Sequence, residues 1–296
     1  MASESHTFGN EGYTARVTAL GAELCSLRDR TGRELIWTGG AWPRHSPVLF
    51  PIIGRVHDNH ALIDGLDYTL TQHGFARDRV FRWAERSETG CTLVLEDDPT
   101  SRALFPFAFR LTLRYALDET GLHVSYDLTN PDTRGTLHAS LGAHPAFVWP
   151  FVPDTAKTDY ILRFEKEEHA PLARLEAGLI VDWSRPNPVK GRELALNDGL
   201  FEEDALIFMH PQSRKLLFGA DRGDGLAFAW HGFEQLGVWM KPGSDFLCLE
   251  PWQGYASPAA FTGPFEEKPG LLHLAPGTSW QAGWSAGLVA GKTLSS

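Results

Sequence analysis

The sequence predicts an all-β protein, a large antiparallel β-sandwich with few and short helices. Apolar and polar residues alternate strictly over many short runs, which is the periodicity of half-buried strands and not of helices. Turn residues separate these runs, and the chain holds 29 glycines and 19 prolines. This spacing favours a sandwich or barrel over alternating strand and helix units. We find no internal repeat and no flexible linker, so residues 1–296 are expected to form a single domain.

The clearest pair of strands lies near the middle of the chain. In the run 109–117, Phe109, Leu111 and Leu113 share one face, and Arg110 and Thr112 share the other. The run 122–128 alternates in the same way after the turn-like DETG, which predicts an antiparallel hairpin. The same criterion predicts shorter strands at 15–20, 35–37, 92–96, 160–164, 215–219, 226–230, 236–241 and 246–250.

The least regular region is 165–192. It begins with the charged string EKEEH, which we interpret as a solvated face. The spacing of leucines that follows predicts a short helix near 172–179.

Composition excludes several classes of protein. The chain has 27 basic and 37 acidic residues, a net charge of −10, which argues against nucleic acid as a partner. The longest uncharged run, 135–153, contains two histidines and three prolines and is therefore not a membrane helix. The first residues lack the pattern of a secretory signal. Cys25, Cys91 and Cys248 show no disulfide or zinc spacing, which favours a reducing cytoplasm.

Residues 47–82 carry the densest group of candidate binding residues. Arg55 follows Gly54 and the apolar run 48–53, where a strand is expected to end at a cleft. His73 and Arg77 lie in the string HGFAR, and both side chains can hydrogen-bond the oxygens of a polyhydroxylated ligand. Between them an Asp-Gly turn flanked by apolar residues predicts a hairpin at 62–70, which would bring Arg55 near His73. The alternative is that these polar residues lie in solvated loops.

Three further residues are candidates for chemistry. His144 lies in GAHPAF, where the following proline fixes the backbone, although a core histidine bound to a backbone partner fits as well. Glu250 interrupts an apolar string in LCLEPWQG. It is either a desolvated carboxylate with a raised pKa, suited to act as a base, or an exposed residue of an edge strand. Asp204 precedes an apolar run, where it fits a turn or a helix cap equally well.

No metal site is expected. His57 and His60 flank Asp58 in VHDNH, but no third ligand follows at a credible spacing, and we interpret the segment as a polar turn.

Four strings, SPVLFPIIGR, HGFAR, GAHPAF and LEPWQG, occur in this order between residues 15 and 280. Together they resemble the aldose 1-epimerase family of galactose mutarotase-like proteins, and within it the LacX-like or hexose-6-phosphate epimerase branch. The resemblance implies the family's large antiparallel sandwich. It also implies cofactor-independent interconversion of the α and β anomers of an aldose. The expected partner is therefore a small sugar or sugar phosphate, with no nucleic acid and no membrane; the oligomeric state is left open.

The resemblance also implies roles for the candidate residues. Glu250 matches the general base that takes the proton of the C1 hydroxyl, and His144 matches the general acid that protonates the ring oxygen. Arg55 and His73 match sugar-binding positions, and Asp204 matches an aspartate that hydrogen-bonds sugar hydroxyls. Arg77, with Arg55, fits either a free sugar or the phosphate of a hexose 6-phosphate.

Ring opening needs one proton removed and one delivered, at two different oxygens, and a glutamate and a histidine divide these tasks naturally. Three alternatives stay open: a hexose-6-phosphate 1-epimerase, a non-catalytic sugar-binding protein, and a glycoside hydrolase or lyase with Asp204 as its second carboxylate.

Overall fold

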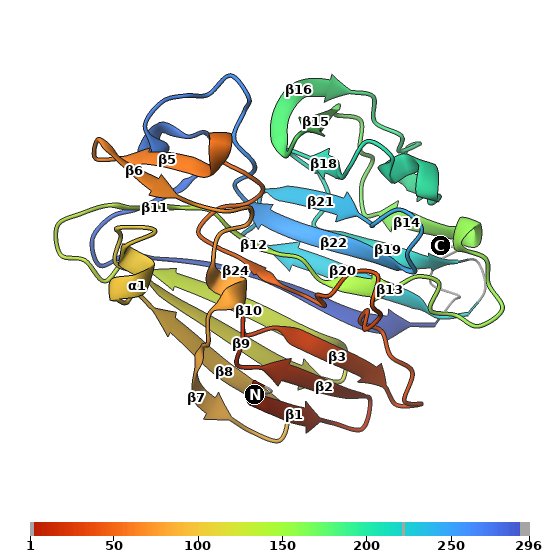
Figure 1. Ribbon diagram of the computed structural model, residues 1–296. Coiled ribbons are helices and arrows are strands. Elements are labelled where there is room, and N and C mark those ends of the chain that lie inside the picture. Colours follow the sequence, from red (N-terminus) through yellow and green to blue (C-terminus); the bar gives the residue numbers. More distant parts are fainter. Residues whose placement is uncertain (1–2, 221–222, 291–296) are drawn as a thin grey trace.

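The computed structural model describes residues 3–220 and 223–290 and confirms an all-β fold (Figure 1). Every pairing between the described strands is antiparallel. The strands are β1 (Ser5–Gly9), β2 (Tyr13–Thr18), β3 (Leu24–Asp29), β4 (Val48–Leu49), β5 (His60–Ile63), β6 (Leu66–Thr69), β7 (Arg82–Arg86), β8 (Gly90–Glu96), β9 (Arg110–Asp118), β10 (Gly121–Thr129), β11 (Leu137–Ala139), β12 (Leu141–Ala143), β13 (Ala146–Val148), β14 (Tyr160–Phe164), β15 (Leu172–Glu176), β16 (Leu179–Arg185), β17 (Glu193–Ala195), β18 (Leu206–Phe208), β19 (Lys215–Ala220), β20 (Gly225–His231), β21 (Gln235–Trp239), β22 (Phe246–Gln253), β23 (Leu272–Leu274) and β24 (Ser279–Val289).

The described helices are all short. They are the α-helix α1 (Pro99–Arg102) and the 3₁₀ turns η1 (His57–Asn59), η2 (Ala76–Asp78), η3 (Lys157–Asp159), η4 (Asp198–Phe201) and η5 (Phe265–Glu267). Among the described residues, none of these helices is long and apolar enough to cross a membrane.

Two large sheets form the sandwich. The nine-stranded sheet has the order β17-β14-β19-β20-β24-β10-β9-β8-β7. The eight-stranded sheet has the order β16-β15-β18-β21-β22-β12-β4, and β13 also pairs with β22. Phe147 of β13 packs on Phe228 of β20 and Trp284 of β24, with ring centroids 5.9 Å and 6.4 Å away. The inner faces of the two sheets thus meet in one hydrophobic core.

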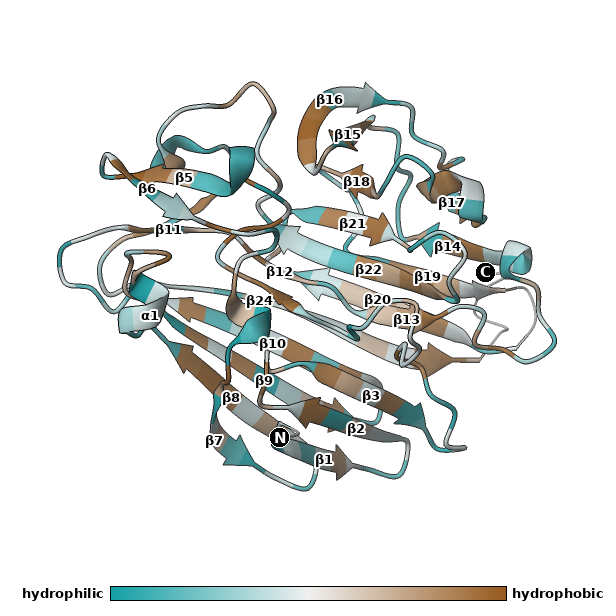
Figure 2. Cartoon of the chain, in the orientation of Figure 1, coloured by the Kyte–Doolittle hydropathy of each residue, from teal (hydrophilic) through white to brown (hydrophobic). Residues whose placement is uncertain are grey.

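The hairpin predicted in the middle of the chain is confirmed. β9 and β10 pair through nine residues, with Leu113 opposite Tyr126 in the buried face. Apolar and polar bands alternate along the nine-stranded sheet in Figure 2, and its edge strand β7 is largely hydrophilic. A charged edge discourages pairing with another chain.

The hairpin predicted at 62–70 is also confirmed, as β5–β6. Asp64 and Gly65 form its turn with φ angles of 50° and 76°, the left-handed region that a tight hairpin turn requires.

Two predicted elements differ from the structure. Residues 35–37 form a single bridge, Ile36 to Phe147, in place of a strand. The helix predicted at 172–179 is wrong: this segment forms β15 and the start of β16. Ala177 and Gly178 make the turn between these strands, with φ angles of 52° and 82° that an α-helix does not contain.

One face of β22 contributes to the sandwich core, and the opposite face carries the candidate catalytic residue Glu250. All eight of its residues are buried, and it lies between β21 and β12. Side chains alternate along a strand, so Leu247 and Leu249 enter the sandwich core. Cys248 and Glu250 point to the other, outer face of the eight-stranded sheet. In Figure 1 the hairpin β15–β16 rises above this face.

Candidate active site

A cavity of about 570 Å³ opens on the outer face of the eight-stranded sheet. Strands β18, β21 and β22 form its floor, the hairpin β15–β16 forms one wall, and segments next to β4 and β12 form another. Its lining contains Trp42, Ile53, Gly54, Gln72, His73, Arg77, His144, Leu175, Gly178, Phe201, Glu202, Asp204, Ala205, Ile207, Trp239, Pro242, Glu250, Trp252 and Ala256.

Glu250 lies on the floor of this cavity and is 2% exposed. The edge-strand alternative is therefore excluded, because β22 has a partner on each side. Burial raises the pKa of Glu250 well above its ordinary value, since the charged form loses its hydration, and the carboxylate of Asp204 raises it further.

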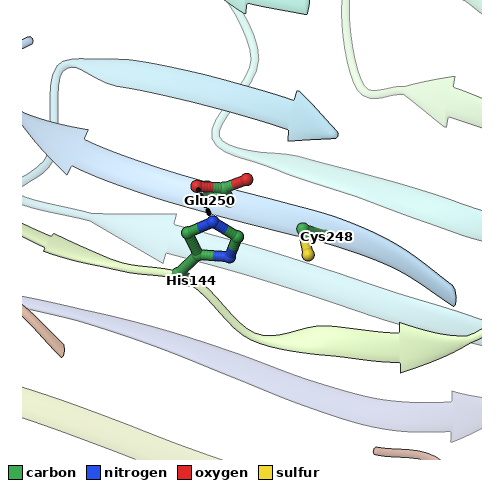
Figure 3. A group of neighbouring side chains, drawn as sticks. All are labelled: His144, Cys248 and Glu250. Atoms are coloured by element: carbon green, nitrogen blue, oxygen red, sulfur yellow. Dashed lines mark ion pairs between the residues drawn. The ribbon is translucent and has the colours of Figure 1, made fainter. Parts of the chain in front are cut away.

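His144 follows β12 directly and precedes Pro145. Its Nε2 lies 3.2 Å from Oε2 of Glu250 (Figure 3). Burial lowers the pKa of His144 to about 3, because the imidazolium form would be desolvated. Its other ring nitrogen, Nδ1, is buried and has no hydrogen-bond partner among the described residues.

The two pKa shifts together determine how many protons the pair holds. Both favour the uncharged forms, a protonated Glu250 and a neutral His144. This state holds one proton between the two side chains, the same number as a glutamate–imidazolium ion pair. The 3.2 Å contact allows that proton to lie on either partner. The pair can therefore give one proton and accept another.

Two tryptophans enclose the imidazole of His144. Trp42 stacks on it with ring centroids 5.0 Å apart and planes at 28°, and Trp239 of β21 meets it edge-on at 5.7 Å. The backbone at Trp42 is held from two sides: the carbonyl of Trp42 accepts from Nε1 of Trp37 at 3.0 Å, and the carbonyl of Ala41 accepts from Nζ of Lys241, which follows β21, at 2.7 Å. These rings exclude water from the pair, which strengthens electrostatic interactions there.

A third tryptophan, Trp252, lies flat over the floor because its neighbours lack side chains. Gly142 of β12 pairs with Trp252, and a Cβ at Gly142 would lie 2.6 Å from the indole. A Cβ at Gly237 of β21 would also meet the indole at 2.6 Å. The two glycines leave room for an aromatic platform, and such surfaces stack on the apolar faces of sugar rings.

His73 is half-buried in the cavity wall. Burial lowers its pKa well below 6.5, and the charges of His144, Arg77 and Arg55 add to the effect. The backbone N–H of Gly54 donates to Nδ1 of His73 at 3.2 Å, so the ring proton of the neutral imidazole lies on Nε2. His73 therefore has one N–H donor left for a ligand.

Arg77 lies in η2 and also lines the cavity. Its Nη2 donates to the carbonyl of Gln72 at 2.7 Å, whereas its buried Nε has no partner within the described part of the chain. Asp78 is 3.8 Å from Nε, too far for a hydrogen bond.

Asp204 and Arg55 lie nearer to solvent. Asp204 is exposed and lines the cavity; its Oδ1 accepts from the N–H of Ala205 at 2.8 Å, and its φ is 71°, so it also serves a turn. Arg55 is exposed and its side chain lies beside Gly178, outside the set of described residues that line the cavity. The structure thus brings five of the six candidates into one cavity and places Arg55 next to it.

Sequence reasoning did not find Cys248 or the tryptophans. Cys248 precedes Glu250 by two positions, so strand alternation already places both on one face. Trp239 and Trp252 follow the same rule on β21 and β22. No comparable signal exists for Trp42, which reaches His144 from a loop.

Comparisons with known proteins agree with this architecture. The family described as Aldose 1-epimerase matches residues 4–286. Protein LacX of Lactococcus lactis subsp. lactis, chromosomal form, is 29% identical over 279 residues, which span 90% of this chain and 93% of the relative. A galactose mutarotase related enzyme from Lactobacillus acidophilus is 28% identical, with a TM-score of 0.89 and 97% of each chain covered. A galactose mutarotase-like protein from Lactobacillus casei ATCC 334, also 28% identical, gives a TM-score of 0.88 over 97% of this chain and 100% of the other.

Proposed function

The chain belongs to the aldose 1-epimerase family, and on that premise we propose that it interconverts the α and β anomers of a hexose without a cofactor. The observation that carries the proposal is the contact between Glu250 and His144, 3.2 Å apart in a cavity of about 570 Å³. A cavity of this size is in the usual range for small-molecule sites.

The proposed reaction begins with ring opening. Glu250, as the carboxylate, accepts the proton of the C1 hydroxyl while His144, as the imidazolium, protonates the ring oxygen. The C1–O5 bond breaks, and its electrons leave with O5 as the C1 oxygen becomes a carbonyl. The open-chain aldehyde rotates about C1–C2. Reclosure on the other face reverses both proton transfers, so the enzyme ends with the proton it began with.

The short distance within the pair supports this chemistry. The C1 hydroxyl oxygen and the ring oxygen are bonded to the same carbon, so the acid and the base must act on neighbouring atoms. A glycoside hydrolase instead needs two carboxyl groups about 5–9.5 Å apart, on opposite sides of the sugar. The partner at contact distance from Glu250 is a histidine, the pairing of base and acid that ring opening requires.

We assign sugar binding to four further side chains. His73 donates from Nε2 to a ring or hydroxyl oxygen, and Arg77 donates from its unpartnered Nε. Asp204 accepts from sugar hydroxyls at the mouth of the cavity. Arg55 contributes from the rim by turning away from Gly178.

One observation favours a hexose 6-phosphate as a second candidate substrate: the buried Nε of Arg77 has no hydrogen-bond partner among the described residues, with Asp78 3.8 Å away, and would suit an anionic oxygen. The carboxylates of Glu202 and Asp204 line the same cavity and oppose an anion. Rates for a hexose and its 6-phosphate decide between them. If the hexose 6-phosphate is the substrate, replacing Arg77 with leucine should lower kcat/KM more for the 6-phosphate than for the free hexose.

Anomerisation of freshly dissolved α-hexoses, followed by polarimetry or exchange NMR, tests the proposed function. We expect the protein to speed the approach to equilibrium well beyond the spontaneous rate. Sugar binding without acceleration would make the chain a binding protein and would overturn the proposal.

A further inference from the structure

A buried thiol lies next to the proposed acid and base. Cys248 precedes Glu250 by two residues on the same face of β22, and it packs within the small apolar cluster formed with Ala146 and Phe246. One ligand atom each from His144, Cys248 and Glu250 lie within 4.8 Å of one another, and all three residues are buried. Figure 3 shows Cys248 and Glu250 on β22 and His144 reaching them from the segment between β12 and β13.

We propose that His144, Cys248 and Glu250 form a zinc site through which the ion inhibits the protein. The three donors are an imidazole nitrogen, a thiolate sulfur and a carboxylate oxygen, all common ligands of zinc. Binding depends on these three side chains alone, whereas inhibition rests on the proposed function.

The spacing of the donors is close to what zinc needs. Bonds of about 2.0–2.1 Å from a tetrahedral zinc to nitrogen and oxygen place these two atoms about 3.3 Å apart. The observed separation between Nε2 of His144 and Oε2 of Glu250 is 3.2 Å. A zinc–sulfur bond of about 2.3 Å places sulfur about 3.6 Å from the other donors. Sγ of Cys248 lies within 4.8 Å of one ring nitrogen of His144 and one carboxylate oxygen of Glu250, so it must approach these two atoms by about 1 Å at most to share an ion with them.

The site has a route of entry and an open coordination position. His144 and Glu250 line the cavity, so the ion reaches them by the path that the sugar uses. Three protein ligands leave the fourth tetrahedral position for a water molecule on the cavity side.

Zinc would displace the proton that His144 and Glu250 hold between them, together with the thiol proton of Cys248. Protonation of the ring oxygen uses the first of these protons, and acceptance of the C1 hydroxyl proton uses the carboxylate of Glu250, which the ion would occupy. Zinc and a sugar undergoing ring opening therefore exclude each other.

The surroundings favour reversible binding over a permanent structural ion. A histidine that ligates a metal usually donates its second ring N–H to a carboxylate or carbonyl, and losing that partner typically costs 10–100-fold in affinity. Nδ1 of His144 has no such partner among the described residues. Zinc should accordingly be removable with a chelator.

Cobalt(II) provides a test that does not depend on activity, because tetrahedral cobalt bound to a thiolate gives a charge-transfer band in the near ultraviolet. We expect the wild-type chain to bind one Co²⁺ with this band. Cys248→Ser should abolish the band and weaken zinc binding, measured by calorimetry, at least about tenfold. Cys91→Ser is the matched control, since Cys91 is also a free, buried cysteine but lies on β8; it should keep both signals. Absence of the band from the wild type would overturn the proposal.

The inhibition is tested with the same proteins. Zinc should slow anomerisation by the wild type and by Cys91→Ser, and a chelator should restore the rate. With each protein compared with its own metal-free rate, Cys248→Ser should need at least about tenfold more zinc for the same fractional inhibition; equal sensitivity would contradict the proposal. Cys248→Ala provides a second variant if serine disturbs folding, which circular dichroism reports. A cobalt band in a protein that does not anomerise any sugar would leave the site in place and refute the epimerase function alone.

Discussion

The substitution Glu250→Gln tests the proposed base most directly. Glutamine has the shape of the protonated glutamate that burial favours, so it fills the same space and can still hydrogen-bond Nε2 of His144. It cannot accept the C1 proton. Losing one acid–base group typically costs roughly 10²–10⁴-fold in rate, or about 3–5 kcal/mol in the activation barrier. The free energy of unfolding should change by less than about 1 kcal/mol, since one neutral hydrogen bond replaces another.

The assay is polarimetry on a fresh α-hexose, with the spontaneous rate subtracted, and denaturant unfolding of the same samples. Glu168→Gln is the matched control, because Glu168 is also 2% exposed. Its two oxygens accept from the N–H groups of Ser213 and Gln212, at 2.8 Å and 3.0 Å, and an amide can accept only one of these bonds. This control should lose about 1–3 kcal/mol of stability and keep its rate. A Glu250→Gln protein that anomerises sugars as fast as the wild type would refute the role of Glu250.

Three further predictions concern the acid, the aromatic floor and a distant histidine pair. His144→Asn should reduce kcat by roughly 10²–10⁴-fold, and adding it to Glu250→Gln should cost little more, because the two act as a unit; additive losses in kcat would contradict this. Gly237→Ala places a Cβ 2.6 Å from the indole of Trp252 and should raise KM more than it lowers kcat; an unchanged KM would count against sugar stacking there. Burial, followed by the charge of His273, lowers the pKa of His138 from 6.5, so the unfolded chain binds a proton more readily than the folded one. The free energy of unfolding should therefore decrease as the pH falls below about 6.5. His138→Gln should reduce the accompanying drop in melting temperature.

The sequence predicts the strands whose inner and outer faces differ in polarity. β9 and β10 are examples, because polar side chains occupy the outer positions of both. β24 was not predicted: it runs through Ser279–Val289 and contains Gly283 and Gly287, which are unusual inside strands. A Cβ at Gly287 would lie 1.8 Å from the carbonyl oxygen of Thr120, so close contact between backbones explains this glycine. Such a contact between distant segments leaves no local pattern.

The wrong helix has a similar cause. Leu172, Leu175 and Leu179 have helical spacing, but β15 and β16 satisfy their burial by pairing with each other and with β18. Gly178 was the available signal for a turn.

The candidate site was only partly predictable. The motifs indicated which residues to examine, and strand alternation could have added Cys248 to Glu250. Whether Glu250 was buried depended on β12 as well as on β21: β21 is the next strand along the chain, but β12 pairs with β22 from about a hundred residues away. The position of Arg55 depended on Gly178, more than a hundred residues away. Contacts between segments far apart in the sequence decide these features, and such contacts leave no recognisable pattern in the local sequence.

The two-sided use of β22 makes this strand unusually sensitive to changes in chain length. Deleting Leu249 would shift the pleat by one step beyond that point, turning the carboxyl group of Glu250 toward Leu247 and its apolar neighbours and Pro251 toward the cavity. Insertions in the β5–β6 turn would not change which residues of β22 face the cavity. Natural variation in length should therefore collect in the outer loops, while the distance along the chain from Phe246 to Trp252 stays constant.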